Sequence, residues 1–271
     1  MAALPSFIYG TAWKQDATAG LVELAVRAGY RALDTANQKK HYREDLAGEA
    51  LVRLYDEGVV TRSDLWLQSK FTSVDGQDHR LPYDPRAPIG EQVVQSFEST
   101  LKNLHTDRLD SFLLHGPAAA GGMTDEDWQV WAALETLFED GRVGAIGVSN
   151  VSPTHIQELL EDARVPPMIV QNRCYAARGW DKAARGLCAQ AQIAYQGFSL
   201  LTANPQVVGS KAVAQIARRM SATPEQVIFR FSKAIGILPL TGTTDERHMK
   251  QDLAALTLPL SGDEIKAILS L

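Results

Sequence analysis

The stretch VGAIGVSNVSPTHIQELL, residues 143–160, contains one complete strand-and-helix unit. Its first eight residues form a short and mostly apolar run, as expected for a buried strand. Ser152 and Pro153 then suit the N-cap and the first position of a helix. Ile156 and Leu159 follow at helical spacing. The unit therefore predicts a strand that is followed at once by a helix packed beside it.

The same alternation continues along the whole chain. Eight strands are predicted, at 7–10, 30–36, 65–70, 108–115, 143–150, 168–173, 193–200 and 235–242. Helices are predicted near 21–26, 46–54, 93–101, 128–137, 153–160, 181–191, 211–220 and 245–255, and a last one begins near 261. Near-continuous apolar strands are typical of parallel sheets covered on both faces. Eight such units favour an α/β fold, a single (β/α)8 TIM barrel over residues 1–271. The alternative is a doubly wound open sheet, but no G-x-G-x-x-G follows any strand.

Composition narrows the function classes. The 271 residues are 45% hydrophobic and carry a net charge of −5 without a dense Lys/Arg block, so neither nucleic acid nor a membrane is the expected partner. The start MAALPSFIYG does not look like a signal peptide, and no apolar run approaches ~18 residues. We expect a cytoplasmic protein whose partner is a small molecule or another protein. Cys174 and Cys188 are expected to be core thiols.

Polar residues stand at the predicted strand ends, where TIM barrels place their chemistry. Asp34, Lys70 and His115 suggest that an acid holds a lysine charged, that the lysine lowers the pKa of a phenol, and that the histidine orients a carbonyl. Each residue also has a structural alternative. Asp34 could be a turn acid, Lys70 a solvated lysine and His115 a hydrogen-bonded core histidine. Their positions on three different strand ends favour the functional reading.

Five motifs carry a family resemblance. They are GYRALDTA at 29–36 with Tyr42 and GEAL at 48–51, SK at 69–70, LDSFLLHGP at 109–117 and GAIGVSN at 144–150. In this order and spacing, from Gly10 to Asp252, they resemble the aldo-keto reductases. The resemblance implies a (β/α)8 barrel that reduces carbonyls with a nicotinamide cofactor, usually NADPH. It also implies the catalytic tetrad Asp34, Tyr42, Lys70 and His115.

The tyrosine departs from the family pattern. Most members have it five residues after the aspartate, where this chain has Lys39, and the loop before Gly48 is two residues longer than usual. We expect the tyrosine to be displaced to Tyr42 and not lost, because an ammonium cannot replace the phenol beside Lys70. Lys39 and Lys40 are interpreted as a solvated loop pair, or as a positive rim that attracts an anionic substrate. His41 either assists proton transfer or caps the loop.

The resemblance also implies a cofactor site. Ser149, Asn150 and Gln171 are similar to the residues that bind the nicotinamide carboxamide, and Phe198 takes the place of the aromatic residue that stacks on the ring. Ser199 and Leu201 belong to the segment along the pyrophosphate. Thr11, at the end of the first strand, is a further candidate.

The segment LTGTTDERHMKQD, 240–252, resembles the adenosine-phosphate site, where a helix N-terminus and Thr243 would bind phosphate. Many members have a lysine and an arginine for the 2′-phosphate where this chain has Gly242 and His248, although Arg247 and Lys250 are close. Gln251 and Asp252 match adenine-contacting positions. The expected cofactor is therefore NADP(H), with NAD(H) as the alternative.

Two other functions compete with an NADPH-dependent reductase of aldehydes and ketones. One is a nicotinamide-binding regulatory module without significant turnover, and the other is an unrelated barrel lyase or isomerase that uses Lys70 as a Schiff-base amine. No metal site is expected. Because no long tail follows the last helix, we expect an open site that accepts a broad range of aldehydes and ketones. Candidates for its apolar walls are Trp13, Trp66 and Trp180. A monomer or weak homo-oligomer is expected.

Overall fold

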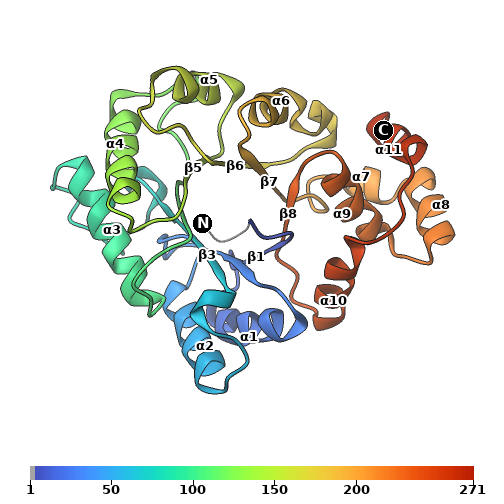
Figure 1. Ribbon diagram of the computed structural model, residues 1–271, viewed down its shortest axis with the longest axis horizontal. Helices are drawn as coiled ribbons and strands as arrows, with labels where there is room; N and C mark the ends of the chain where they lie inside the picture. Colours follow the sequence, from blue (N-terminus) through green and yellow to red (C-terminus); the bar gives the residue numbers. More distant parts are fainter. Residues whose placement is uncertain (1–3) are drawn as a thin grey trace.

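Eight parallel strands close into a barrel in the computed structural model, which describes residues 4–271 (Figure 1). The strands are β1 (Ile8–Gly10), β2 (Ala32–Asp34), β3 (Trp66–Phe71), β4 (Ser111–Leu114), β5 (Ile146–Ser149), β6 (Ile169–Arg173), β7 (Ala194–Phe198) and β8 (Leu238–Thr241). Each strand pairs with the next one along the chain, and β8 pairs with β1 to close the ring. The predicted (β/α)8 barrel is confirmed, and the open doubly wound sheet is excluded.

Helices form the outer ring around this barrel (Figure 1). They are α1 (Thr18–Ala28), α2 (Glu44–Asp56), α3 (Ile89–Asn103), α4 (Asp125–Glu139), α5 (Pro153–Asp162), α6 (Lys182–Gln190), α7 (Pro205–Val208), α8 (Lys211–Met220), α9 (Pro224–Ala234), α10 (Glu246–Ala255) and α11 (Gly262–Leu269). Each predicted helix is present. Ser152 and Pro153 occupy the N-cap and first position of α5, as its sequence indicates.

Two helices, α7 and α9, were not predicted from the sequence and lie with α8 between β7 and β8. The N-terminus of α9 carries clear helix signals. Thr223 accepts a hydrogen bond from the Gln226 amide in a capping box, and Pro224 occupies the first turn. Val227 and Phe231 then place buried side chains at helical spacing. These cap and spacing signals were present in the sequence.

The barrel interior is apolar at one end and polar above it. The apolar floor is a cluster of buried side chains from six strands or their immediate neighbours: Ile8, Ala32, Trp66, Leu113, Ala145 and Ile169. Trp66 belongs to this floor, and Trp180 is buried against Phe231 at 5.0 Å between ring centroids. The expectation that either tryptophan forms a wall of the substrate site is therefore wrong.

Both cysteines are core thiols. Cys174 and Cys188 are buried and unpaired, and burial raises the pKa of each thiol to about 12. Among residues 4–271, none of the helices has the length and apolar character needed to cross a bilayer. The expectation that the N-terminus is no signal peptide falls partly on residues 1–3, which lie outside the described part of the chain.

Candidate active site

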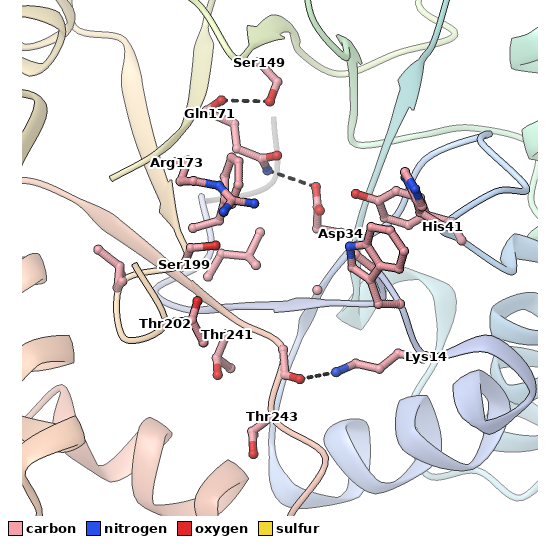
Figure 2. Close-up of a pocket in the computed structure, with 18 of the residues that line it drawn as sticks. Lys14, Asp34, His41, Ser149, Gln171, Arg173, Ser199, Thr202, Thr241 and Thr243 are labelled. Carbon is pink, nitrogen blue, oxygen red and sulfur yellow. Dashed lines mark hydrogen bonds between the residues drawn. The ribbon is translucent and has the colours of Figure 1, made fainter. Parts of the chain in front are cut away.

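A cleft of about 640 Å³ opens at the carboxyl ends of the strands (Figure 2). Both ends of the chain contribute to its walls, because Gly10 is the last residue of β1 and Thr241 is the last residue of β8. Ten of the predicted site residues line it: Asp34, Tyr42, His115, Ser149, Asn150, Gln171, Phe198, Ser199, Leu201 and Thr243. The cleft therefore lies where barrel enzymes carry their chemistry.

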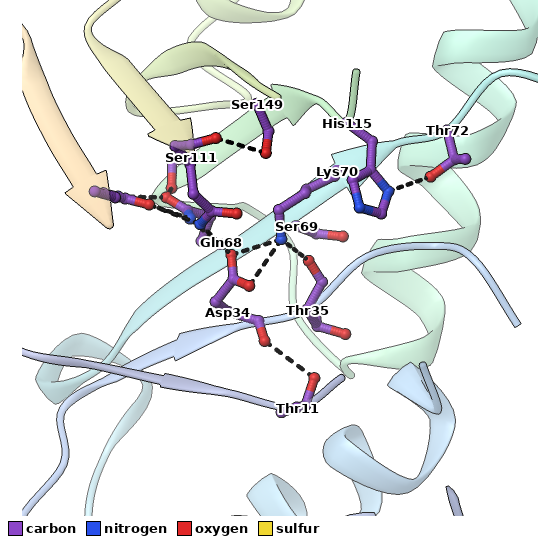
Figure 3. Close-up of polar contacts among 12 residues, drawn as sticks. Thr11, Asp34, Thr35, Gln68, Ser69, Lys70, Thr72, Ser111, His115 and Ser149 are labelled. Carbon is purple, nitrogen blue, oxygen red and sulfur yellow. Dashed lines mark hydrogen bonds and ion pairs between the residues drawn. The ribbon is translucent and has the colours of Figure 1, made fainter. Parts of the chain in front are cut away.

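A buried ion pair forms the floor of the cleft. Lys70 Nζ donates to both carboxylate oxygens of Asp34, at 2.7 and 2.8 Å, and to the carbonyl of Thr35 at 2.8 Å (Figure 3). The Lys70 side chain is only 1% exposed. A buried ammonium is stable only when its charge is paired and its hydrogens are bonded, and this geometry meets both needs.

Glutamines support the carboxylate from below. The Nε2 atoms of Gln68 and Gln171 donate to Asp34 Oδ1 at 2.7 and 3.0 Å. Gln68 and Gln196 exchange amide hydrogen bonds across the barrel at 2.7 and 2.9 Å, and Gln171 Nε2 also donates to Gln196 Oε1 at 2.9 Å. Ser111 completes the layer through a bond of 2.8 Å to Gln68. The sequence analysis did not identify Gln68 and Gln196, which lie on β3 and β7.

The loop after β2 brings Tyr42 back over this pair. The amides of His41 and Tyr42 both donate to the carbonyl of Gln38, at 3.0 and 2.9 Å, so the chain makes one turn before α2 begins. The Tyr42 ring centroid then lies 5.5 Å from Lys70 Nζ and 5.9 Å from the His115 ring. The structure thus brings the four tetrad side chains together, while Lys39 and Lys40 are exposed and do not line the cleft.

The electrostatics of Tyr42 differ from the expectation. Burial raises the pKa of its phenol, and the carboxylates of Asp34 and Glu44 raise it further. Lys70 was expected to lower it. However, Asp34 balances the charge of Lys70, so burial dominates. The phenol is consequently protonated at neutral pH.

His115 is a neutral imidazole in this environment. Burial lowers its pKa to about 3, and Lys70 and His41 lower it as well. Its Nδ1 lies 2.7 Å from the Thr72 hydroxyl (Figure 3). When Thr72 donates this bond, the imidazole carries its proton on Nε2 and can donate it.

Polar side chains and one aromatic ring line the next part of the cleft. Ser149 Oγ donates to the backbone carbonyl of Gln171 at 2.8 Å. Asn150 Nδ2 donates to the carbonyl of His115 at 2.8 Å and to Ser149 Oγ at 3.2 Å. Asn150 has a φ of 58°, a left-handed conformation that asparagine tolerates, which turns its side chain toward His115. Phe198 lies beside them at the end of β7.

Four predicted cofactor residues lie outside the cleft. Thr11 is buried, and its hydroxyl donates to the carbonyl of Asp34 at 3.0 Å, which ties the ends of β1 and β2 together. His248 is exposed on α10, and Gln251 lines a separate surface hollow. Asp252 is buried against β8, where it accepts a bond of 3.0 Å from Thr241. Burial raises the pKa of this carboxyl to about 7. Asp252 therefore faces the barrel wall and not an open ligand site.

The N-terminus of α10 also differs from the phosphate site that the sequence suggests. Asp245 is its N-cap, and Oδ1 accepts from the His248 amide at 3.1 Å. This carboxylate occupies one of the backbone amides that a phosphate would need at the helix N-terminus, and its negative charge would repel a phosphate. The helix end is thus a poorer anion site than expected.

Lys14 is a site residue that the sequence analysis missed. It follows Trp13 in the loop after β1, and its ammonium donates to the carbonyl of Gly242 on the wall of the cleft (Figure 2). A Cβ atom at Gly242 would lie 3.4 Å from Lys14 Nζ, so the lysine fills the space beside this glycine. Burial lowers the pKa of Lys14. Its position four residues after the end of the first predicted strand was the available signal.

Three further contacts shape the rim. Trp13 and His41 stack with ring centroids 3.8 Å apart, and His41 Nδ1 lies 2.8 Å from Gln38 Oε1. Trp13 is thus the one tryptophan of the three candidates that lines the cleft. On the other side, the Arg173 guanidinium lies 5.5 Å from the centre of the Phe198 ring. Arg173 was also missed, although it ends the predicted strand 168–173.

Comparisons with known proteins agree with this geometry. The sequence matches the aldo/keto reductase family over residues 8–271. It is 30% identical to the glyoxal reductase of Bacillus subtilis over 247 residues, which cover 91% of this chain and 80% of that protein. It is 26% identical to the NADPH-dependent D-xylose reductase of Meyerozyma guilliermondii, covering 98% of this chain and 90% of that protein.

Solved structures have the same fold. An aldo-keto reductase of Bombyx mori in complex with NADP superposes with a TM-score of 0.83 at 22% identity, over 98% of this chain and 89% of that one. An aldo/keto reductase of Brucella melitensis gives 0.83 at 25% identity, over 98% and 93%. Because the family match extends from β1 to the last residue of the sequence, this chain belongs to the aldo/keto reductase family of oxidoreductases.

Proposed function

We propose that the protein reduces aldehydes and ketones to alcohols, with NADPH as the electron donor and Tyr42 as the proton donor. The observation that carries the proposal is the convergence of Tyr42, Lys70 and His115 above Asp34 at the floor of one cleft. A relative named glyoxal reductase and another named D-xylose reductase support small polar carbonyl compounds as the substrate class.

The cleft fits a nicotinamide. Gln171 uses its Nε2 as a donor to Asp34 and Gln196, so its Oε1 remains an acceptor for a carboxamide N–H. Ser149 and Asn150 add polar atoms at the same edge, and Phe198 offers a flat apolar face. When bound, the nicotinamide would supply the hydride that reduces the carbonyl carbon.

The residues of the chain would handle the proton and the developing negative charge. His115, neutral and held by Thr72, would orient the carbonyl oxygen through an Nε2–H donor. Tyr42 would give its proton to that oxygen, which it can do because burial keeps the phenol protonated. Lys70, fixed by Asp34, would then stabilise the phenolate, because it lies 5.5 Å from the ring centroid.

The preference for NADPH over NADH is supported by Lys14. Its ammonium lies beside Gly242, next to Thr243. It therefore brings a cation to the position where many family members have a lysine and this chain has Gly242. The exposed Arg247 can add a second charge to the 2′-phosphate. The carboxylate of Asp245 opposes this attraction, so the preference depends on Lys14.

Replacing Tyr42 by phenylalanine tests the assignment. The ring remains while the hydroxyl is lost, so we expect NADPH to bind normally and turnover of a panel of aldehydes to fall by about 10²–10⁴-fold. Loss of nicotinamide absorbance measures turnover, and quenching of tryptophan fluorescence measures binding. Unchanged turnover in Tyr42→Phe would refute the proton-donor role. A wild-type protein that binds NADPH and reduces no carbonyl would instead be the nicotinamide-binding regulatory module.

A further inference from the structure

Arg173 is a charged residue that the proposed chemistry does not use. It ends β6, two residues after Gln171, and lines the cleft together with Phe198 and Ser199. Within residues 4–271 its guanidinium has no ion-pair partner and no side-chain hydrogen bond, and its contact is the Phe198 ring at 5.5 Å. An exposed cation on an aromatic face is held weakly compared with a guanidinium bonded to phosphate. Arg173 is therefore free to exchange this contact for an anion.

The charge balance of the cleft favours the binding of an anion. Asp34 is the only acidic residue among the cleft-lining residues, and Lys70 neutralises it. Burial lowers the pKa of both histidines in the cleft, His115 and His41, so neither adds much charge at neutral pH. Arg173 and Lys14 remain as uncompensated cations on the walls, in a protein whose net charge is −5. The cleft is thus a positive region of an acidic molecule.

The position of Arg173 determines which part of a nicotinamide dinucleotide it can reach. It lies next to Gln171 and Phe198, the residues proposed to bind the nicotinamide, and away from Lys14, which contacts Gly242 after β8. In a nicotinamide dinucleotide the diphosphate follows the ring after one ribose, whereas the 2′-phosphate belongs to the far adenosine. An arginine fork matches phosphate oxygens in a bidentate manner.

We propose that Arg173 binds the diphosphate of the dinucleotide, leaving the Phe198 ring as the nicotinamide takes its place there. This inference rests on the proposed function. NADPH and NADH both contain this diphosphate, so loss of Arg173 should weaken the binding of both cofactors. Loss of Lys14 should weaken the binding of NADPH.

Replacing Arg173 by methionine tests the proposal, because methionine keeps apolar contact with the ring and loses the charge. We expect the Kd values of NADPH and NADH to rise by the same factor, about tenfold, and the dependence of Kd on salt to weaken. Arg173→Lys should recover part of the affinity, since it restores charge without the fork. Equilibrium titration by tryptophan fluorescence gives each Kd without any turnover, and Trp13 lies in the cleft as a reporter.

Arg178→Met is the matched control. Arg178 is exposed like Arg173 and lies 5.2 Å from the centre of the Tyr175 ring, but neither residue lines the cleft. We expect its Kd values to match the wild type. Equal losses in Arg173→Met and Arg178→Met, no loss in Arg173→Met, or a loss for NADPH alone would each overturn the role of Arg173. A wild-type protein that binds neither dinucleotide would overturn the proposed function itself, which keeps the two failures distinct.

Discussion

Two cations on the walls of one cleft have different neighbours and so different expected ligands. Lys14 reaches Gly242, at the start of the segment that continues through Thr243 to α10. Arg173 rests on Phe198, which ends β7. Substitution of each residue should therefore leave a different signature in cofactor binding.

Lys14→Met should weaken NADPH selectively. Removing the ammonium takes a charge from the adenosine end, so we expect the Kd of NADPH to rise about tenfold and that of NADH to change less than about threefold. Fluorescence titration of both cofactors measures the ratio. Lys40→Met, which removes an exposed loop lysine outside the cleft, serves as the control. Equal losses for the two cofactors in Lys14→Met would mean that this lysine holds a group common to both.

Glu44 is a buried acid next to the residues that we propose to be catalytic. Its carboxylate accepts from Ser69 at 2.5 Å and from Thr100 at 3.0 Å, and so links α2 to β3 and α3. Burial raises its pKa from 4.5 to about 7, although these hydrogen bonds and Lys70 pull the pKa down. The folded protein therefore favours the protonated acid more strongly than the unfolded chain does.

Glu44→Gln should flatten the pH dependence of stability. The contribution of Glu44 is complete below pH 4.5 and is lost as the pH rises through 7, because the unfolded chain ionises first. Between pH 5.5 and 8 we expect the wild type to lose about 2 kcal/mol of unfolding free energy through this group, and the amide variant to keep it. Urea unfolding at the two pH values measures both proteins. Identical pH dependence in the two would show that Glu44 does not titrate in this range.

At the scale of elements, α2 determines where Tyr42 can lie, because the tyrosine stands two residues before the first residue of the helix. The position of α2 depends on a close approach to α3. A Cβ atom at Gly48 would lie 1.9 Å from the Asn103 carbonyl oxygen, which is the backbone at the end of α3. Glycine is required there by space.

Gly48→Ala and Gly20→Ala should have opposite effects. The first must push α2 away from α3, and we expect a loss of about 2 kcal/mol in unfolding free energy together with reduced turnover. The second lies on α1, where nothing is within 4 Å of an added Cβ, and should gain about 0.5 kcal/mol from higher helix propensity. Urea unfolding compares them directly. A Gly48→Ala protein as stable as Gly20→Ala would contradict the close contact.

At the scale of the whole molecule, the barrel was predictable because each strand is buried on both faces and so appears in the sequence as an apolar run. The strand ends likewise identified Asp34, Lys70 and His115. Other features depend on residues that meet only after folding. Gln68 and Gln196 are 128 positions apart and pair across the interior, and Lys14 meets Gly242 from the opposite end of the chain. The sequence also does not tell which face of α10 packs on β8, and the structure places Asp252 on that face.

The layered interior has a consequence for how protons travel. Beneath Asp34 and Lys70 lie the amides of Gln68, Gln171 and Gln196, and beneath these lies the apolar floor around Trp66. Neither amides nor hydrocarbon side chains exchange protons readily near neutral pH. Protons therefore do not reach Tyr42 through the barrel interior, and a proton that would replace one given up by Tyr42 enters from the surface, through the cleft or through the small hollow that Tyr42 and Glu44 also line. A product that fills the cleft would close the first route, and reprotonation of Tyr42 before product release would then depend on the second.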